Sequence, residues 1–249
     1  MVHRTLVDLR QEPSRSRRSL KKNSRKPGYF EWILDTTRTK DSYEKILASF
    51  AKHEADILVG TQMIVKGHDF PNVTLVGVIA ADLSLNMDDY HCGERTFQLL
   101  TQAVGRSGRG NRPGQAVIQT YQPEHYSIQA AAIQDYEKFY KEEMGYRMLL
   151  DYPPAAHMMT VFGACQDEEL LKNAMYYIEV FIRRVSPKEE LHMIGPAAAS
   201  VGKVKDVYRQ VIHLKHRDIC FLTAVREKLE KYIEINSGFR KIYIQFDMN

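Results

Sequence analysis

Apolar residues in the first half of the chain follow two alternating spacings. From residue 41, DSYEKILASFAKH has its apolar side chains three and four residues apart and a capping-box pair at its start, which predicts an amphipathic helix: Tyr43, Ile46, Leu47 and Phe50, with Asp41 and Glu44. Three short, almost wholly apolar runs predict buried strands at 55–60, 74–82 and 114–121, and 94–105 has helical spacing. Buried strands that alternate with helices predict an α/β domain with a parallel sheet covered on both faces.

The pattern changes after residue 125. Residues 127–150 predict one long helix, and the YPP sequence at 152–154 would end it. Beyond it, strands are expected at 158–164, 208–216 and 241–247, with helices at 168–184 and 218–234. This order predicts a small α+β domain with a split βαβ arrangement. We therefore expect one domain at 35–125 and a second at 126–249.

Charge sets the N-terminal segment apart. The 249 residues, 44% of them hydrophobic, are enough for two modest cores. Residues 1–30 hold nine of the 35 Lys and Arg residues but two of the 31 Asp and Glu residues, so the remainder has a net charge near −3. The positive balance therefore belongs to this segment, and a basic DNA-binding arm is one interpretation of it.

Cysteine usage and hydropathy limit the class of protein. Cys92, Cys165 and Cys220 are far apart, which argues against a zinc site or a disulfide framework and favours the reducing cytoplasm. No apolar run reaches the ~18 residues of a membrane-spanning helix. We expect no bound metal and no membrane association.

The stretch GTQMIVKGHDF (60–70) follows a predicted buried strand. Thr61 and Gln62 offer polar groups to a phosphate, Gly67 permits close backbone approach, and Asp69 could accept a hydrogen bond from a ribose hydroxyl. An ordinary turn after a strand is the alternative interpretation.

The stretch QAVGRSGRG (102–110) ends a predicted helix. Arg106 and Arg109 are two forked donors on flexible backbone, which suits the charge on a transferring phosphoryl group. A basic helix end followed by glycines is the alternative.

Together the two stretches resemble motifs V and VI of superfamily 2 helicases, in the form found in the PriA family of replication-restart DNA helicases. The resemblance extends through ERTFQLLTQ, IQTYQPEHY and the YPP sequence. It implies a second RecA-like helicase lobe of an ATP-hydrolysing 3′ to 5′ DNA helicase. It assigns catalytic roles to Gln102, Arg106 and Arg109, nucleotide contacts to Gly67, Asp69 and Gly105, and DNA contacts to Thr61 and Gln62.

The C-terminal domain also resembles its counterpart in this family. GKVKDVYRQV (202–211) matches a basic and aromatic loop, which implies DNA contacts by Lys203, Lys205, Tyr208 and Arg209. Gln210 stands where relatives often have Trp, and the alternative is a charged hairpin with Tyr208 packed on the sheet. Single-stranded or forked DNA, single-strand-binding protein and other primosome proteins are the partners that the resemblance implies.

The sequence contains no phosphate-binding loop of the form G-x-x-x-x-G-K-[ST], and the family's zinc insertion and first lobe are missing from it. The full-length family uses ATP and magnesium, but we expect this chain alone to need no cofactor, to hydrolyse no ATP and to unwind no DNA. The alternative function is a stand-alone, non-enzymatic DNA- or partner-binding protein.

The basic N-terminal segment has a second interpretation. In the family, a V-E-E-E-L-K-K helix and an R-V-x-R-M-D-L strand precede the D-T-T sequence of 35–37. Plausible codons for these, read one base later, encode the sequences found here at 12–21 and 28–33. We therefore expect residues 1–34 to be a non-native or disordered tail produced by a shifted reading frame, and the sheet to be incomplete.

Overall fold

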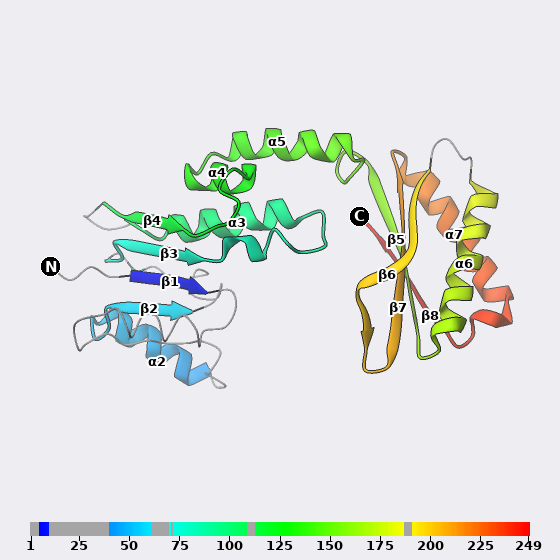
Figure 1. The fold of residues 1–249 in the computed structure, drawn as a ribbon, viewed down its shortest axis with the longest axis horizontal. Coiled ribbons are helices and arrows are strands. Elements are labelled where there is room, and N and C mark those ends of the chain that lie inside the picture. Colours follow the sequence, from blue (N-terminus) through cyan, green and yellow to red (C-terminus); the bar gives the residue numbers. More distant parts are fainter. Residues whose placement is uncertain (1–4, 10–39, 61–69, 71, 109–112, 187–190) are drawn as a thin grey trace. The chain divides into compact units, whose positions relative to one another are not determined.

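The computed structural model describes residues 5–9, 40–60, 70, 72–108, 113–186 and 191–249. The chain divides into two units, Met1–Glu143 and Met144–Asn249, each with a sheet and a core of its own (Figure 1). The sequence places the division at 125 and 126, whereas in the structure it lies within helix α5 (Tyr136–Leu149).

The first unit contains a four-stranded parallel sheet of order β2-β1-β3-β4. Its strands are β1 (Thr5–Leu9), β2 (Ile57–Gly60), β3 (Leu75–Ile79) and β4 (Gln115–Ile118). Strands β2, β3 and β4 lie within the three predicted apolar runs, so the α/β class and the parallel sheet are confirmed.

The sheet was expected to be incomplete, but strand β1 fills the position between β2 and β3. Thr5–Leu9 lies between β2 and β3 and pairs in parallel with both, with Val7 opposite Val59 and Gly77. The sequence TLVDL is rich in residues that favour strands, and pairing it between β2 and β3 satisfies the facing backbone groups of both neighbours. The N-terminal segment therefore contributes a central strand. The rest of the tail predicted at 1–34 lies outside the described residues.

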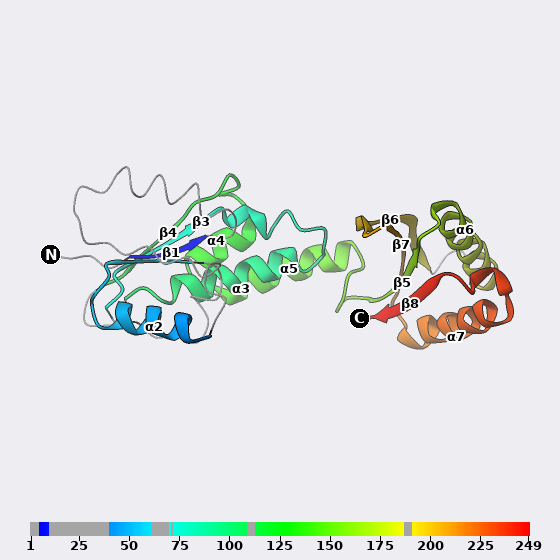
Figure 2. The same ribbon diagram turned by 90° about the horizontal axis from the view of Figure 1, so that it is seen from below.

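Helices α2 (Lys40–Ala51) and α3 (Cys92–Val104) cover one face of the parallel sheet (Figure 2). Alternation along β2 and β3 directs every second side chain towards them. One core cluster joins the helices to the sheet and includes Ile46, Phe50, Leu58, Val76, Val78, Phe97 and Leu100. The helical periodicity predicted for both segments is confirmed.

The predicted helix at 127–150 is two helices, α4 (Tyr126–Ala132) and α5. Gln134 between them has a φ of 55°, a left-handed conformation that ends a helix. Asp135 then starts α5, because its side chain accepts a hydrogen bond of 2.9 Å from the backbone N–H of Lys138. Residues 127–150 therefore contain a break that hydrophobic spacing does not reveal.

The second unit contains an antiparallel sheet of order β6-β7-β5-β8. Its elements follow the chain order β5 (His157–Cys165), α6 (Glu168–Val185), β6 (His192–Val204), β7 (Val207–His216), α7 (Ile219–Ile235) and β8 (Tyr243–Met248). Strand β7 lies between β5 and β6, and β5 lies between β7 and β8. This is the split βαβ arrangement that the order of elements predicts.

Strand β6 is absent from the elements predicted by sequence. Its sequence HMIGPAAASVGKV contains Gly195, Pro196 and several small residues, and its pairing with β7 is irregular between Ile194 and Ala197. Pro196 is tolerated because β6 lies at the edge of the sheet, where the outer side of the strand has no neighbour to hydrogen-bond. Among the described helices, none is long and apolar enough to cross a membrane.

Candidate functional site

The end of helix α3 carries the described part of the predicted arginine motif. Gln102 is exposed on the last turn of α3, and Gly105 is its C-cap. The Gly105 N–H donates to the Thr101 carbonyl oxygen at 2.9 Å, and the Arg106 N–H donates to that of Ala103 at 3.0 Å. Arg106 is half-buried in the turn that follows, so the structure places it directly beyond the helix end.

Arg109 lies outside the described residues, but the turn before it is well defined. The Gly108 N–H donates to the Val73 carbonyl oxygen at 3.2 Å. Gly108 has a φ of 74°, and a Cβ atom there would lie 2.7 Å from the backbone nitrogen of Gly114. The close approach of two backbone segments therefore requires glycine at this position of the arginine motif.

The residues predicted to contact phosphate and DNA after β2 also lie outside the described residues: Thr61, Gln62, Gly67 and Asp69. Their flanks are described. Strand β2 ends at Gly60, and Phe70 is buried with its ring 5.0 Å from that of Phe50 in an edge-to-face contact. Because the Gly108 N–H donates to the Val73 carbonyl oxygen, the arginine motif lies beside the segment that follows the 60–70 stretch. The two motifs are about 40 residues apart in sequence, but the end of one lies next to the segment that follows the other.

Asp82 is a buried acidic residue at the carboxyl end of β3 that the sequence did not single out. Its carboxylate accepts hydrogen bonds from the Thr120 hydroxyl at 2.5 Å and from the Tyr121 N–H at 3.0 Å. Burial tends to raise the pKa of Asp82, but these hydrogen bonds outweigh it and hold the pKa below its usual value. Asp82 therefore fixes the chain after β4 to the end of β3.

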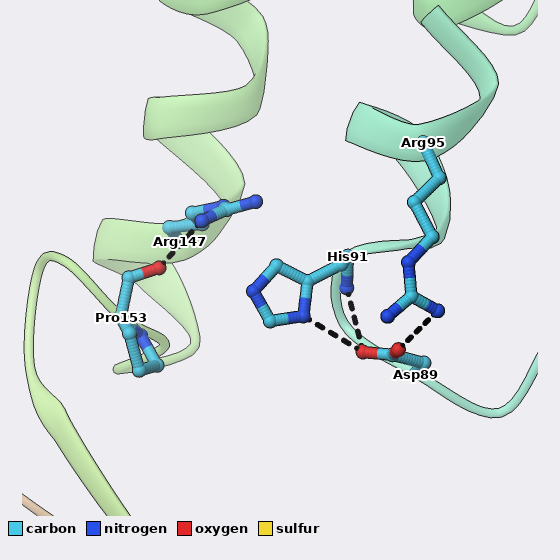
Figure 3. Close-up of polar contacts among 5 residues, drawn as sticks. All are labelled: Asp89, His91, Arg95, Arg147 and Pro153. Atoms are coloured by element: carbon cyan, nitrogen blue, oxygen red, sulfur yellow. Dashed lines mark hydrogen bonds and ion pairs between the residues drawn. The ribbon is translucent and has the colours of Figure 1, made fainter. Parts of the chain in front are cut away.

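Asp89 organises the start of helix α3 (Figure 3). It accepts a hydrogen bond from the His91 N–H at 3.0 Å, its Oδ1 also lies 3.0 Å from His91 Nδ1, and Arg95 binds its other oxygen at 2.6 Å. Burial opposes the charge, yet the contacts with His91 and Arg95 lower the pKa of Asp89. The carboxylate therefore stays ionised near neutral pH and anchors the helix that carries Gln102.

Helices α4 and α5 are joined by a partly buried polar contact beside α3. The Tyr126 hydroxyl donates to Glu143 Oε2 at 2.6 Å. Burial and this hydrogen bond raise the pKa of Tyr126 far above its usual value. Gly93 on α3 makes room for the pair, because a Cβ atom there would lie 2.5 Å from the Tyr126 hydroxyl oxygen. Small size at Gly93 therefore sets how closely α3 approaches α4.

The predicted basic loop of the second unit is a hairpin between β6 and β7. Val204 pairs with Val207, and the two turn residues, Lys205 and Asp206, have φ values of 47° and 62°. Both central residues are left-handed, as in a type I′ hairpin turn. Lys205 is exposed at the tip.

Lys203 is held within this hairpin. Its Nζ lies 3.1 Å from Asp206 Oδ1, donates to the Tyr208 hydroxyl at 3.2 Å and stands 4.5 Å from the centre of the Tyr208 ring. Asp206 and then Tyr208 raise the pKa of Lys203. Lys203 is exposed and can contact a phosphate, but its charge is already paired with Asp206.

Tyr208 and Arg209 lie on opposite faces of β7. Tyr208 packs against the core cluster that the sheet forms with α6 and α7, whereas Arg209 follows on the other face. Packing of the Tyr208 ring on the core corresponds to the alternative interpretation of this loop, in which the ring is part of the sheet.

A pocket of about 530 Å³ lies elsewhere in the second unit. It is lined by Asp151, Ala156, His192, Lys215, His216, Arg217 and Asp218. Lys215 is buried, and its Nζ donates to the Leu150 carbonyl oxygen at 2.9 Å and lies 3.3 Å from the centre of the Tyr152 ring. Burial lowers the pKa of Lys215. Arg147 likewise donates to the Pro153 carbonyl oxygen at 2.7 Å (Figure 3), so two buried cations fasten the segment before β5.

Among the residues that the structure describes, no group of three or more His, Cys, Asp and Glu side chains could hold a metal ion.

Comparison with known protein families gives a match within the first unit. The sequence family described as "Helicase conserved C-terminal domain" matches residues 14–111, a range that begins inside the N-terminal segment. In solved structures, the C-terminal domain of the DEAD-box protein Dbp5 covers 58% of this chain and 83% of its own, with 15% identity and a TM-score of 0.39.

Relatives named "Replication restart protein PriA" match most of the chain. The protein of Bacillus subtilis (strain 168) is 41% identical over 217 residues, which are 87% of this chain and 27% of the relative. That of Synechocystis is 42% identical over 203 residues, or 80% and 24%. That of Borreliella burgdorferi is 32% identical over 215 residues, or 86% and 32%.

The chain thus spans between a quarter and a third of the length of these relatives. The chain belongs to the PriA family, of which it represents the C-terminal part.

Proposed function

We propose that this chain supplies the second half of a PriA-type DNA helicase motor together with its C-terminal DNA-contacting unit. In this proposal Arg106 and Arg109 approach the terminal phosphate of ATP, which is the substrate, and Gln102 lies beside them. The observation that carries the proposal is the position of Arg106 directly after α3, in a turn hydrogen-bonded to the segment that follows the 60–70 stretch. Guanidinium donors suit the charge that develops on a transferring phosphoryl group.

The arginines alone do not make an ATPase. Such residues stabilise charge on a nucleotide that other groups bind, namely a phosphate-cradling loop and a magnesium ion. No sequence of the phosphate-loop form occurs in this chain. We therefore propose that the chain by itself hydrolyses no ATP, and that Gly67, Asp69 and Gly105 adjoin a nucleotide held mainly by another polypeptide segment.

DNA contact is proposed at two places. Thr61 and Gln62 follow β2 in the helicase lobe, and Lys203, Lys205 and Arg209 lie in or beside the β6–β7 hairpin. Exposed lysines at a hairpin tip suit the phosphate backbone of single-stranded or forked DNA. Single-strand-binding protein and other primosome proteins are the proposed protein partners.

A non-enzymatic DNA-binding protein is the second candidate. The second unit favours it, because it has its own sheet, its own core of more than a dozen buried residues and no dependence on the helicase motifs for either. In that case the chain would bind DNA through this unit, and the helicase lobe would take no part in ATP-driven unwinding.

A chimaera tests the motor proposal. Residues 35–249 would replace the matching C-terminal part of the B. subtilis relative, and DNA-stimulated ATP hydrolysis would be measured. We expect an active chimaera in which Arg106→Ala or Arg109→Ala lowers kcat by ~10³-fold or more. Arg183→Ala, at an exposed arginine on α6 that pairs with Glu179, is the matched control. An active chimaera that tolerates both motif substitutions would contradict the assignment of these arginines.

A further inference from the structure

The antiparallel sheet of the second unit has one face turned away from its helices. Alternate residues of the three strands β5, β7 and β8 pack with α6 and α7 in one core, among them Met159, Val161, Ile212, Leu214, Ile244 and Phe246. Both helices lie on this side of the sheet in the two views (Figures 1 and 2). The residues between them in sequence therefore form a second face, here called the open face.

Strand register arranges the open face in rows. Each row crosses β7, β5 and β8, so its side chains are direct cross-strand neighbours. The first row is Arg209, Ala164 and Tyr243, the second is Val211, Phe162 and Gln245, and the third is His213, Thr160 and Asp247. In the third row, His213 Nδ1 lies 3.0 Å from the Thr160 hydroxyl oxygen, which shows that these two side chains share the face.

Two aromatic rings lie on neighbouring rows of this face. Tyr243 is 60% exposed, and its hydroxyl donates to Gln245 Oε1 at 3.0 Å, which orients the ring along β8. Phe162 is half-buried on the central strand β5. The small Ala164 between Tyr243 and Arg209 leaves room above the sheet. Tyr208, which the sequence suggested for base stacking, packs on the opposite face.

Positive charge borders the aromatic rings. Arg209 stands in the first row, at the end of β7 that leads to the β6–β7 hairpin. Lys203 and Lys205 are exposed in that hairpin, four and two residues before Val207, the first residue of β7. Asp247 is acidic but lies in the third row, at the far side from the hairpin. The polarity of the open face therefore runs from basic at the hairpin to mixed at the opposite end.

We propose that the open face binds single-stranded DNA, with bases stacked on Tyr243 and Phe162 and phosphates held by Arg209 and the hairpin lysines. This inference rests on the proposed function, since it names where the second unit meets DNA. Exposed aromatic rings beside a basic border are the features by which proteins bind single strands, and a four-stranded sheet presents such rings on one plane. Duplex DNA offers no free base faces, so the rings favour the single strand.

Fluorescence anisotropy of the full chain with a labelled oligothymidine tests this. The oligonucleotide should have about 20 nucleotides, more than the ~4–16 that one binding module covers. We expect Tyr243→Ala to weaken binding by about 5- to 100-fold, as for the loss of one stacked base, and Tyr243→Phe to stay within about twofold. Phe162→Leu keeps an apolar side chain on the central strand and should also weaken binding. Tyr176→Ala, at a similarly exposed tyrosine on α6, should have no effect.

Photocross-linking gives a readout that does not depend on variant folding. Oligonucleotide containing 5-iododeoxyuridine is cross-linked to the unmodified chain, and the attached peptides are identified by mass spectrometry. Cross-links at Tyr243 or Phe162 would support the proposal. Binding with cross-links confined to α6 or α7, or unchanged binding by Tyr243→Ala, would overturn the open-face proposal and leave the proposed function standing. A chain that bound no single-stranded DNA would instead contradict the DNA contact in the proposed function.

Discussion

Replacement of Phe139 by Ala tests whether the first half of α5 belongs to the helicase lobe. Phe139 is buried, stacks on Phe97 of α3 with ring centres 4.2 Å apart and lies 6.0 Å from the ring of Tyr126. The side chain is part of the core cluster that also contains the parallel sheet. Removing it leaves a cavity between α3, α4 and α5.

The expected cost is large. A buried Phe→Ala substitution typically lowers the free energy of unfolding by about 3–5 kcal/mol, through lost burial and the cavity that remains. The free energy of unfolding of a domain is about 5–15 kcal/mol, so the first unit should lose about a fifth of its stability or more. Tyr140 is the next residue on the same helix and 52% exposed, so Tyr140→Ala should change stability by about 0.5 kcal/mol or less.

Hydrogen exchange followed by mass spectrometry separates the two units. In Phe139→Ala, amides of α3 and β3 that exchange through unfolding of the first unit should exchange at least about 100-fold faster, since each 1.4 kcal/mol corresponds to a factor of ten. Amides of β5, β7 and α7 should keep their rates. Faster exchange in the second unit with unchanged exchange in α3 would refute the assignment of this half of α5 to the helicase lobe.

Three further predictions concern single contacts. Gly93→Ala should destabilise the first unit by about 1–3 kcal/mol in urea unfolding, because its Cβ would meet Tyr126 and Glu143, whereas Gly145→Ala on α5 meets no atom within 4 Å and should not. Asp82 has a lowered folded pKa, so its stabilisation is present above its unfolded pKa and is lost as pH falls through the folded value. Asp82→Asn should flatten that acid loss in thermal unfolding, and an unchanged pH profile would count against it. Asp206→Asn should release Lys203 and raise the affinity for single-stranded DNA by about twofold, while weaker binding would show that Asp206 orders the hairpin instead.

Hydrophobic spacing predicted the elements whose faces are strongly amphipathic or wholly buried. Helix α3 and strands β2, β3 and β5 follow from it, because their apolar positions contact a core. Strand β6 did not follow, since an irregular edge strand with Pro196 lacks alternation. The break at Gln134 did not follow either, because it depends on one backbone conformation between two helical segments.

The candidate site was predicted in part. Motif resemblance located Gln102 and Arg106, and the structure places them at the end of α3. It could not show which face of β7 carries Tyr208, because that depends on the register of β7 with β5 and on the core beneath it. The same register reveals Tyr243 and Phe162, which are distant in sequence and become neighbours only in the folded sheet. Alternation in KIYIQFD could have indicated that Tyr243 faces away from the core.

Strand β1 shows the limit of reasoning from composition. The basic segment suggested first a DNA-binding arm and then a frame-shifted tail, yet TLVDL within it pairs with two strands of the sheet. Whether a short segment forms a strand depends on the neighbouring strands that the rest of the fold provides. The net charge of the segment carries no information about those neighbours.

The most direct test of the account measures ATP hydrolysis and DNA binding in one sample of the purified chain. With oligothymidine present, we predict a saturable rise in anisotropy and no ATP hydrolysis above the rate of a protein-free control. DNA-stimulated hydrolysis that Arg106→Ala abolishes would show a complete motor in this chain and would contradict the account.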